Sequence, residues 1–297
     1  MFRTTTSQLL LRMALLFVLC SMSGLANAQE KPLSEEEAVK QFRAISKAGP
    51  FRADVGTVAE MQIPAGYRYV GKDKIAALNK LTGNRTSPGD VGALMPENIG
   101  WFIFFTYSDE GYVKDDEKDK LDAKALLESL QENQKEDNKA RVQEKLTPLT
   151  LLGWEKPPFF DSNTKNLTWA IKLQAQGQAD YTVNYESRVL GRSGYMSCTL
   201  VISPDQLDST IPVYDKLLTS FNYKSGQKYS EWKPGDKVAA IGLAALVGGG
   251  AVALAAKSGF LAKFIKPIII GVVAFFGAIA AFFKKLFGFG KKETPQE

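Results

Sequence analysis

Three segments in the second half of the chain alternate between apolar and polar residues with a period of two, which indicates β-strands. Their apolar sets are Leu167, Trp169, Ile171 and Leu173; Tyr181, Val183, Tyr185 and Val189; and Met196, Cys198, Leu200 and Ile202. The sequence Gly191-Arg192-Ser193-Gly194 predicts a hairpin turn between the last two strands. Pro204 then opens an amphipathic helix, which we expect to cover one face of the sheet.

Helical and strand patterns also alternate in the first half of the chain. Ser34 followed three residues later by Glu37 predicts a capping box at the start of a helix. The other elements expected there are a strand, a turn and a strand over 55–70, a short helix over 72–81, and an apolar central strand over 101–107.

The longest helical stretch runs from Leu121 to Lys145, and its second half is almost wholly polar. We expect that half to face solvent, with Asp137 and Arg141 as an i,i+4 ion pair. The acidic residues at 115–122 are better explained by a solvated loop that caps this helix than by a calcium site. Pro157-Pro158 is expected to break the chain before the next strand. The whole pattern predicts an α+β fold, a mostly antiparallel sheet with flanking helices on one side.

Two apolar runs near the C-terminus predict a transmembrane helical anchor. Residues 238–256 carry no charge and are long enough to cross the hydrocarbon as a helix. Residues 267–283 form a second run, so we expect a hairpin, with a re-entrant or interfacial second helix as the alternative. Residues 225–237 are then a linker, and 284–297 form a basic tail.

The N-terminus has the features of an export signal. A short apolar core is followed by Ala26-Asn27-Ala28, which fits a cleavage site, so residues 1–28 are a predicted signal peptide. Residues 29–224 then form an exported domain. Together with the anchor, the export signal predicts a protein of the bacterial inner membrane whose soluble domain faces the periplasm. The lipid bilayer is then a predicted partner.

The composition excludes several kinds of chemistry. The 297 residues include no histidine and two cysteines, one of them in the predicted signal. Catalytic triads, Cys-His pairs and imidazole metal sites are therefore excluded. We predict no catalytic residues, no cofactor and no metal site. The net charge is +5, but nine lysines follow residue 232, so the basic character belongs to the anchor rather than to a nucleic-acid surface.

Several motifs resemble one bacterial family, the domain of unknown function 2167. They include MQIPAGYR at 61–68, GYVKDD at 111–116, GWEKPP at 153–158, and DKVA at 236–239 leading into GLAAL at 242–246. The resemblance implies an exported domain on a C-terminal membrane anchor, with no established reaction.

The residues between the apolar positions of the three strands supply the candidate site. They are Thr168, Lys172, Asn184, Glu186, Arg188, Ser197 and Thr199, which we expect on the sheet face away from the helix after Pro204. Arginine on a rigid strand can bind a carboxylate or phosphate through two hydrogen bonds. We therefore predict a binding surface made by Asn184, Arg188 and Arg192. The alternative is a solvated face with an Arg188–Glu186 pair.

These features favour a non-enzymatic periplasmic binding or interaction module, which would bind an envelope protein or an anionic envelope component. Two other functions are left open. One is a carboxylate-dependent hydrolase of envelope polymers, and the other is an accessory subunit of a membrane complex.

The export signal yields the first testable prediction. N-terminal sequencing of the mature protein should begin at Gln29 because cleavage follows Ala28. Recovery of Met1, or of a lipid attached to Cys20, would contradict both the cleavage site and the assigned compartment.

Overall fold

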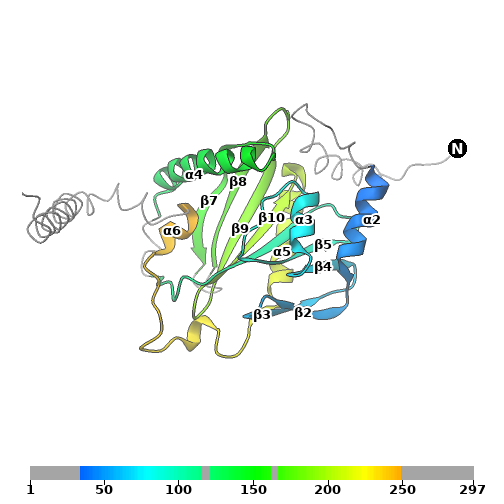
Figure 1. The fold of residues 1–297 in the computed structure, drawn as a ribbon. Coiled ribbons are helices and arrows are strands. Elements are labelled where there is room, and N and C mark those ends of the chain that lie inside the picture. Colours follow the sequence, from blue (N-terminus) through cyan, green and yellow to red (C-terminus); the bar gives the residue numbers. More distant parts are fainter. Residues whose placement is uncertain (1–33, 116–120, 162–165, 249–297) are drawn as a thin grey trace, which may run out of the picture. The chain divides into compact units, whose positions relative to one another are not determined.

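The computed structural model describes residues 34–115, 121–161 and 166–248 (Figure 1). An eight-stranded sheet has the order β1-β4-β5-β6-β10-β9-β8-β7, and a smaller sheet has the order β11-β3-β2. All pairings between these strands are antiparallel. The predicted α+β class with a mostly antiparallel sheet is therefore confirmed.

The strands are β1 (Lys47–Ala48), β2 (Phe51–Val55), β3 (Ala59–Ile63), β4 (Tyr67–Gly71), β5 (Asp90–Pro96), β6 (Phe102–Ser108), β7 (Leu149–Asp161), β8 (Asn166–Ala175), β9 (Thr182–Leu190), β10 (Tyr195–Ile202) and β11 (Phe221–Tyr223). The helices are α2 (Glu35–Ile45), α3 (Ile75–Leu81), α4 (Ala123–Gln143), α5 (Leu207–Leu218) and α6 (Leu243–Gly248). Short 3₁₀ turns occupy Pro204–Gln206 and Tyr229–Glu231.

Local signals in the sequence agree with most of these elements. Ser34 and Glu37 form the predicted capping box of α2, and Asp122 caps α4 by accepting a hydrogen bond of 3.0 Å from the Ala125 amide. The hairpin turn closes through the Gly191 amide, which donates to the Gly194 carbonyl at 2.8 Å. Strand β6 lies inside the large sheet, between β5 and β10, as its continuous apolar character predicts.

Two strand predictions need correction. Pro157-Pro158 does not break the chain but lies within β7, because β7 is an edge strand and leaves one row of backbone groups unpaired. The register with β8 shifts three times along β7, so the edge is irregular. The strands on either side of the Pro64–Gly66 turn also do not pair with each other, since β3 joins the small sheet and β4 the large one.

Helices flank both faces of the large sheet, and not one side as expected. On one face, called here the α5 face, α5 and the small sheet cover a core that includes Tyr185, Cys198 and Tyr214. On the opposite face, called the α3 face, α2 and α3 pack on β4, β5 and β6 through a second core that includes Phe42, Leu78 and Phe102. Figure 1 shows α2 and α3 on one side of the sheet and α5 beyond it.

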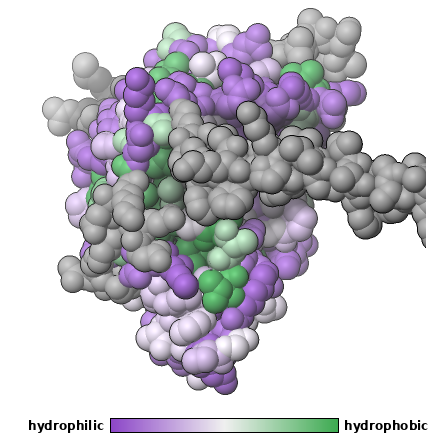
Figure 2. Space-filling view, turned by 90° about the vertical axis from the view of Figure 1, so that its left-hand side faces the viewer, coloured by the Kyte–Doolittle hydropathy of each residue, from purple (hydrophilic) through white to green (hydrophobic). Residues whose placement is uncertain are grey.

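Helix α4 covers the edge strand β7 with its polar residues. The side-chain amide of Asn138 donates to the Leu149 carbonyl at 2.8 Å and accepts from the Leu149 amide at 2.9 Å, as a neighbouring strand would. Gln131 donates to the Leu151 carbonyl at 3.4 Å. The polar half of α4 is therefore partly occupied in covering an edge that would otherwise pair with other chains. Figure 2 shows this side of the body, where hydrophilic residues dominate the upper part of the view.

Residues 225–248 lie against the body, and we call this segment the strap. Arg192 of the hairpin turn binds the Asp236 carboxylate through two hydrogen bonds of 2.7 Å. Tyr112 stacks on Trp232 with ring centroids 5.1 Å apart and forms a β-bridge with Val238. The segment expected to link the body to the membrane, 225–237, is thus in contact with the body over much of its length.

The predicted membrane segments fall mostly outside the described residues. The chain divides into units 1–250 and 251–297, and residues 249–297 are not described. Within 238–248 a helix begins at Leu243 and not at Val238, and the carbonyl of Gly248 accepts hydrogen bonds from Ser129 and Asn133 of α4. No helix in the described part of the chain has both the length and the apolar composition for crossing a membrane. The anchor stays a prediction.

The strap should detach when its ion pair is removed. Asp236→Ala leaves the Arg192 guanidinium without its carboxylate, so we expect faster tryptic cleavage after Lys228 and Lys237 than in the wild-type protein. Asp205→Ala, which removes an exposed carboxylate elsewhere, is the control.

Arg192 and the Lys233 amide hold the pKa of Asp236 at about 2. Because this pKa is lowered, the attachment of the strap should persist above pH 3.8 and be lost as the pH falls toward about 2, which amide hydrogen exchange of residues 225–238 can follow at acid pH, where trypsin is inactive. Equal cleavage of both variants would contradict this function of the ion pair.

Candidate functional site

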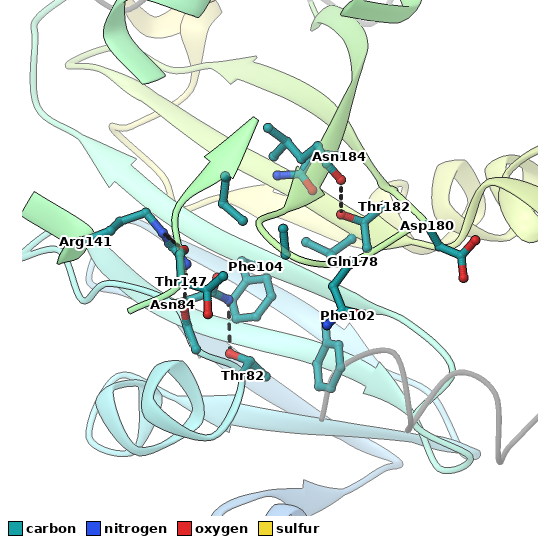
Figure 3. A pocket seen from close by; sticks show the side chains of 15 residues that line it. Thr82, Asn84, Phe102, Phe104, Arg141, Thr147, Gln178, Asp180, Thr182 and Asn184 are labelled. Carbon is teal, nitrogen blue, oxygen red and sulfur yellow. Dashed lines mark hydrogen bonds between the residues drawn. The ribbon is translucent and has the colours of Figure 1, made fainter. Parts of the chain in front are cut away.

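A groove opens on the α3 face of the large sheet, between the C-terminal ends of α3 and α4 (Figure 3). Its volume is about 860 Å³, counting the part that is open to solvent. The lining residues are Thr82, Gly83, Asn84, Phe102, Phe104, Arg141, Thr147, Leu149, Leu173, Ala175, Gln178, Asp180, Thr182, Asn184 and Val201. We call this the α3–α4 groove.

Strand register builds the floor of the groove. Val201 lies opposite Phe102 of β6 on one side and opposite Asn184 of β9 on the other, so these side chains form one row across three strands. Leu173 and Thr182 are paired in the same way on β8 and β9. The floor is therefore mainly apolar and aromatic, with single polar side chains at fixed points, as in many ligand-binding pockets.

Arg141 fixes the two walls relative to each other. Its guanidinium donates to the Thr147 carbonyl at 2.7 Å and to the Gly83 carbonyl at 3.0 Å, which ties α4 to the loop after α3. Burial lowers the pKa of this arginine. The expected Asp137–Arg141 pair is wrong, because Asp137 binds Arg85 at 2.7 Å while Arg141 turns inward to these carbonyls. Arg141 therefore shapes the groove, and two of its N–H groups already donate to backbone carbonyls.

The polar groups at the groove are mostly neutral. Asn84 donates to Thr82 at 3.0 Å, and Thr182 donates to the Leu173 carbonyl at 3.3 Å. The side-chain amide of Asn184 has no hydrogen-bond partner among the described residues, and Figure 3 shows it beside the lining side chains. An amide can both donate and accept, so Asn184 is available to a ligand. The exposed Asp180 carboxylate is the charged group at the rim.

The structure separates the three predicted binding residues. Asn184 lines the groove, whereas Arg188 lies two alternate positions further along β9, in an ion pair with Glu186 at 2.6 Å. Its guanidinium also lies over the Trp169 ring, 4.6 Å from the centroid. The side chains of Arg188 and Glu186 are only 15% and 10% exposed. The Arg188–Glu186 pair is present, but on a covered face and not a solvated one.

Arg192 lies in the hairpin turn and holds the strap. Both of its hydrogen bonds to Asp236 are intramolecular, and the pair raises the pKa of the arginine. Ser193 beside it donates to Gln227 at 2.9 Å and contacts the Tyr107 hydroxyl at 3.2 Å. The surface of Asn184, Arg188 and Arg192 stays a prediction. The geometry, however, gives each of the three a different environment.

The predicted polar face is also wrong for β8, whose side chains point to the opposite faces of the sheet from those expected. Thr168 lies opposite Ser187, and Leu167 lies opposite Arg188. Thr168 and Lys172 therefore belong to the α5 face, while the apolar set from Leu167 to Leu173 shares the α3 face with Asn184, Glu186 and Arg188. The position of α5 on the face away from Arg188 is as predicted.

Other candidate residues have structural explanations where they are described. Cys198 is fully buried, and burial raises the pKa of its thiol, as expected for a core cysteine. Of the acidic segment at 115–122, residues 116–120 lie outside the described part, and Asp122 is the cap of α4. Among the described residues, no group of three or more His, Cys, Asp or Glu side chains is placed to hold a metal ion.

Sequence patterns did not reveal the residues that shape the groove. Phe102 and Phe104 are predicted as part of a central strand, and Arg141 as part of a solvated helix. Nothing in their spacing indicates a common cavity, because they lie far apart in the chain and meet only through sheet order and helix placement.

Comparisons with known proteins give a family and a distant structural likeness. The model of the family described as Protein of unknown function (DUF2167) matches residues 47–280. No curated protein matches the chain. The solution structure of cyanobacterial PsbP (CyanoP) from Synechocystis sp. PCC 6803 is similar at 12% identity and a TM-score of 0.35, over 67% of this chain and 99% of that one. At that score the likeness supports no conclusion about ligand or activity.

The Arg188–Glu186 pair should matter for folding. Arg188→Met leaves the buried Glu186 carboxylate without a cation, which we expect to cost about 3 kcal/mol of unfolding free energy. The double variant Glu186→Gln/Arg188→Met should recover much of that loss, because no charge is then stranded. Arg85→Met, in an exposed ion pair, is the matched control and should lose little. Denaturant unfolding of the purified variants would measure this, and equal losses for Arg188→Met and Arg85→Met would contradict it.

Proposed function

The chain belongs to the family Protein of unknown function (DUF2167), and we propose that it is a membrane-anchored envelope protein whose exported body binds a ligand in the α3–α4 groove without converting it. One observation carries the proposal. The groove combines an apolar floor with neutral hydrogen-bonding groups, and the Asn184 amide among them has no partner in the described residues.

The dimensions and chemistry of the groove limit the ligand. About 130 Å³ of the groove is open to the centre of a water-sized sphere, which is room for a small molecule or one short segment of a polymer. Phe102, Phe104 and Leu173 favour an apolar portion of the ligand, whereas Asn84, Gln178 and Asn184 favour amides or hydroxyls. We therefore propose a largely uncharged envelope component, such as a segment of a peptide or a wall polymer. Both arginines that suggested an anion are engaged in ion pairs.

The alternative of a carboxylate-dependent hydrolase gains no specific support from the groove. Hydrolysis of a glycosidic bond normally uses two carboxyl groups on opposite sides of the scissile bond. Among the described residues that line the groove, Asp180 is the one carboxylate, and it is exposed at the rim. The alternative of an accessory subunit in a membrane complex depends on the apolar runs at 238–256 and 267–283, which lie mostly outside the described residues.

The proposed location combines the export signal, the apolar runs and the family. We propose that the body faces the periplasm and that the inner membrane holds its C-terminal end. The attachment of the strap supports a body held close to that end, since Gly248 is bonded to Ser129 and Asn133 of α4.

Photo-crosslinking in intact cells would identify the ligand. A photoreactive phenylalanine analogue replaces Gln178 at the rim of the groove, and in a parallel strain it replaces Ala179, which is exposed and does not line the groove. We expect a specific adduct from position 178 that is absent from position 179. Adducts of equal kind and amount from both positions would contradict binding in the groove.

Filling the groove should abolish that adduct. Ala175→Trp places a large side chain at the lining of the groove, while Ala179→Trp adds the same group outside it. Ala175→Trp should therefore reduce the crosslink from position 178 by at least about tenfold, with a melting temperature close to that of Ala179→Trp. Unreduced crosslinking in a folded Ala175→Trp protein would contradict the proposal.

A further inference from the structure

The last described helix, α6, lies inside the first apolar run that the sequence assigns to the membrane. That run, 238–256, carries no charge and would need nearly all of its length to cross the hydrocarbon as a helix. In the structure, however, Leu243, Leu246 and Val247 of α6 are buried. Figure 1 shows α6 next to α4, with which it packs. The same residues therefore have two candidate environments, the body and the bilayer.

The contact with α4 is made at the end of the described chain. The Gly248 carbonyl accepts hydrogen bonds from the side chains of Ser129 and Asn133, which are one turn apart on α4. A Cβ atom at position 248 would lie 3.4 Å from the Ser129 Cβ and 3.6 Å from the Leu126 side chain. Glycine at this position therefore lets α6 approach α4 closely enough for both hydrogen bonds.

The chain is also fixed just before α6. The Tyr112 amide donates to the Lys237 carbonyl at 2.8 Å, and the Ala239 amide donates to the Tyr112 carbonyl at 2.9 Å. Gly111, at φ +99°, permits this approach, because a Cβ there would lie 2.8 Å from the Lys237 carbonyl oxygen. Val238, the first residue of the predicted transmembrane run, is thus in a β-bridge and not in a helix. The first part of the run is therefore bound to the body at both of its ends.

Docking on the body and crossing the bilayer exclude each other on length. A helix over the whole of 238–256 would span about 28 Å, close to the thickness of the hydrocarbon. If 238–248 stay on the body, residues 249–256 are the part left before Lys257, and as a helix they would span about 12 Å. That length is less than half of the hydrocarbon.

The surface of α4 favours docking over insertion. Apolar side chains of α6 leave water in either environment, because lipid tails are about as apolar as a protein core. The Leu126 side chain, in contrast, is fully buried in the docked structure and would lose the cover of Gly248 if α6 moved into lipid. Insertion would also give up the hydrogen bonds from Ser129 and Asn133. Docking therefore removes two apolar surfaces from water, whereas insertion removes one.

We propose that α4 is the docking surface for residues 243–248 in the membrane-bound protein, so that the first apolar run does not cross the bilayer. The occupant of this surface is a segment of the same chain, which the strap holds in place. The anchor is then left to the second run, 267–283. The proposal does not depend on the groove or on a ligand there, and it leaves the proposed location of the body unchanged.

A covalent link between the two helices tests this inference in the membrane. The double variant Ser129→Cys/Gly248→Cys places the two Cβ atoms 3.4 Å apart, near the lower end of the range found in disulfides. Full-length protein in isolated cell membranes is oxidised with copper phenanthroline, and the linked tryptic peptides are measured by mass spectrometry. A short bis-maleimide, used in parallel, does not require disulfide geometry. We expect both reagents to link the pair.

The matched control is Glu136→Cys/Gly248→Cys, because Glu136 is exposed two turns further along α4. Its linking should be at least about tenfold slower, since two turns separate the positions by about 10 Å. Cys198 is fully buried and can remain in all variants. If 238–256 cross the bilayer as a helix, position 248 lies near the middle of the membrane and neither reagent links it to α4. Absence of both links in membranes, links that appear only after detergent extraction, or equal rates for the two pairs would overturn the proposal.

The contribution of the strap is tested in the same background. Asp236→Ala removes the ion pair with Arg192 and should slow the link between positions 129 and 248 about fivefold, because a looser tether lowers the effective concentration of α6 at α4. Asp205→Ala, an exposed acid elsewhere, should leave the rate unchanged. Equal rates in the two variants would overturn the claim that the strap holds α6 on α4.

Discussion

The register of β9 with β8 and β10 is the constraint on which the other features depend. One register pairs Trp169 with Glu186 and Glu186 with Thr199, and so decides which side chains share each face of the large sheet. Both faces are then covered, by α2 and α3 on one side and by α5 with the small sheet on the other. A charged pair within a covered face needs internal partners, and Glu186 accepts hydrogen bonds from both Arg188 and Thr199, although the buried Nε of Arg188 has no partner among the described residues.

The groove occupies a place where covering elements stop. The α3–α4 groove lies where α3 and α4 end, and Arg141 ties its two walls together by donating hydrogen bonds to backbone carbonyls on both sides. Because strands fix its floor, the groove has preformed geometry, and ligand binding there need not order a loop first.

Charged and aromatic contacts also join the strap to this framework. Arg192 holds Asp236 from the hairpin between β9 and β10, and Tyr112 stacks with Tyr229 and Trp232. The end of the described chain is thereby fixed to α4 through Gly248. The last described residue, Gly248, therefore lies against the helix that also contributes Arg141 to the groove.

The sequence alone determined the elements whose signals are local: the capping box of α2, the alternating strands, the Gly191–Gly194 turn and the helix after Pro204. It could not determine which strand faces coincide, because alternation sets the phase within a strand and register sets the phase between strands. For that reason Thr168 was assigned to the wrong face, and Asn138 and Arg141 were assigned to solvent. Only the tertiary structure brought Phe102, Arg141 and Asn184 to one groove, since contacts between residues so distant in the chain are decided by packing and not by local propensity.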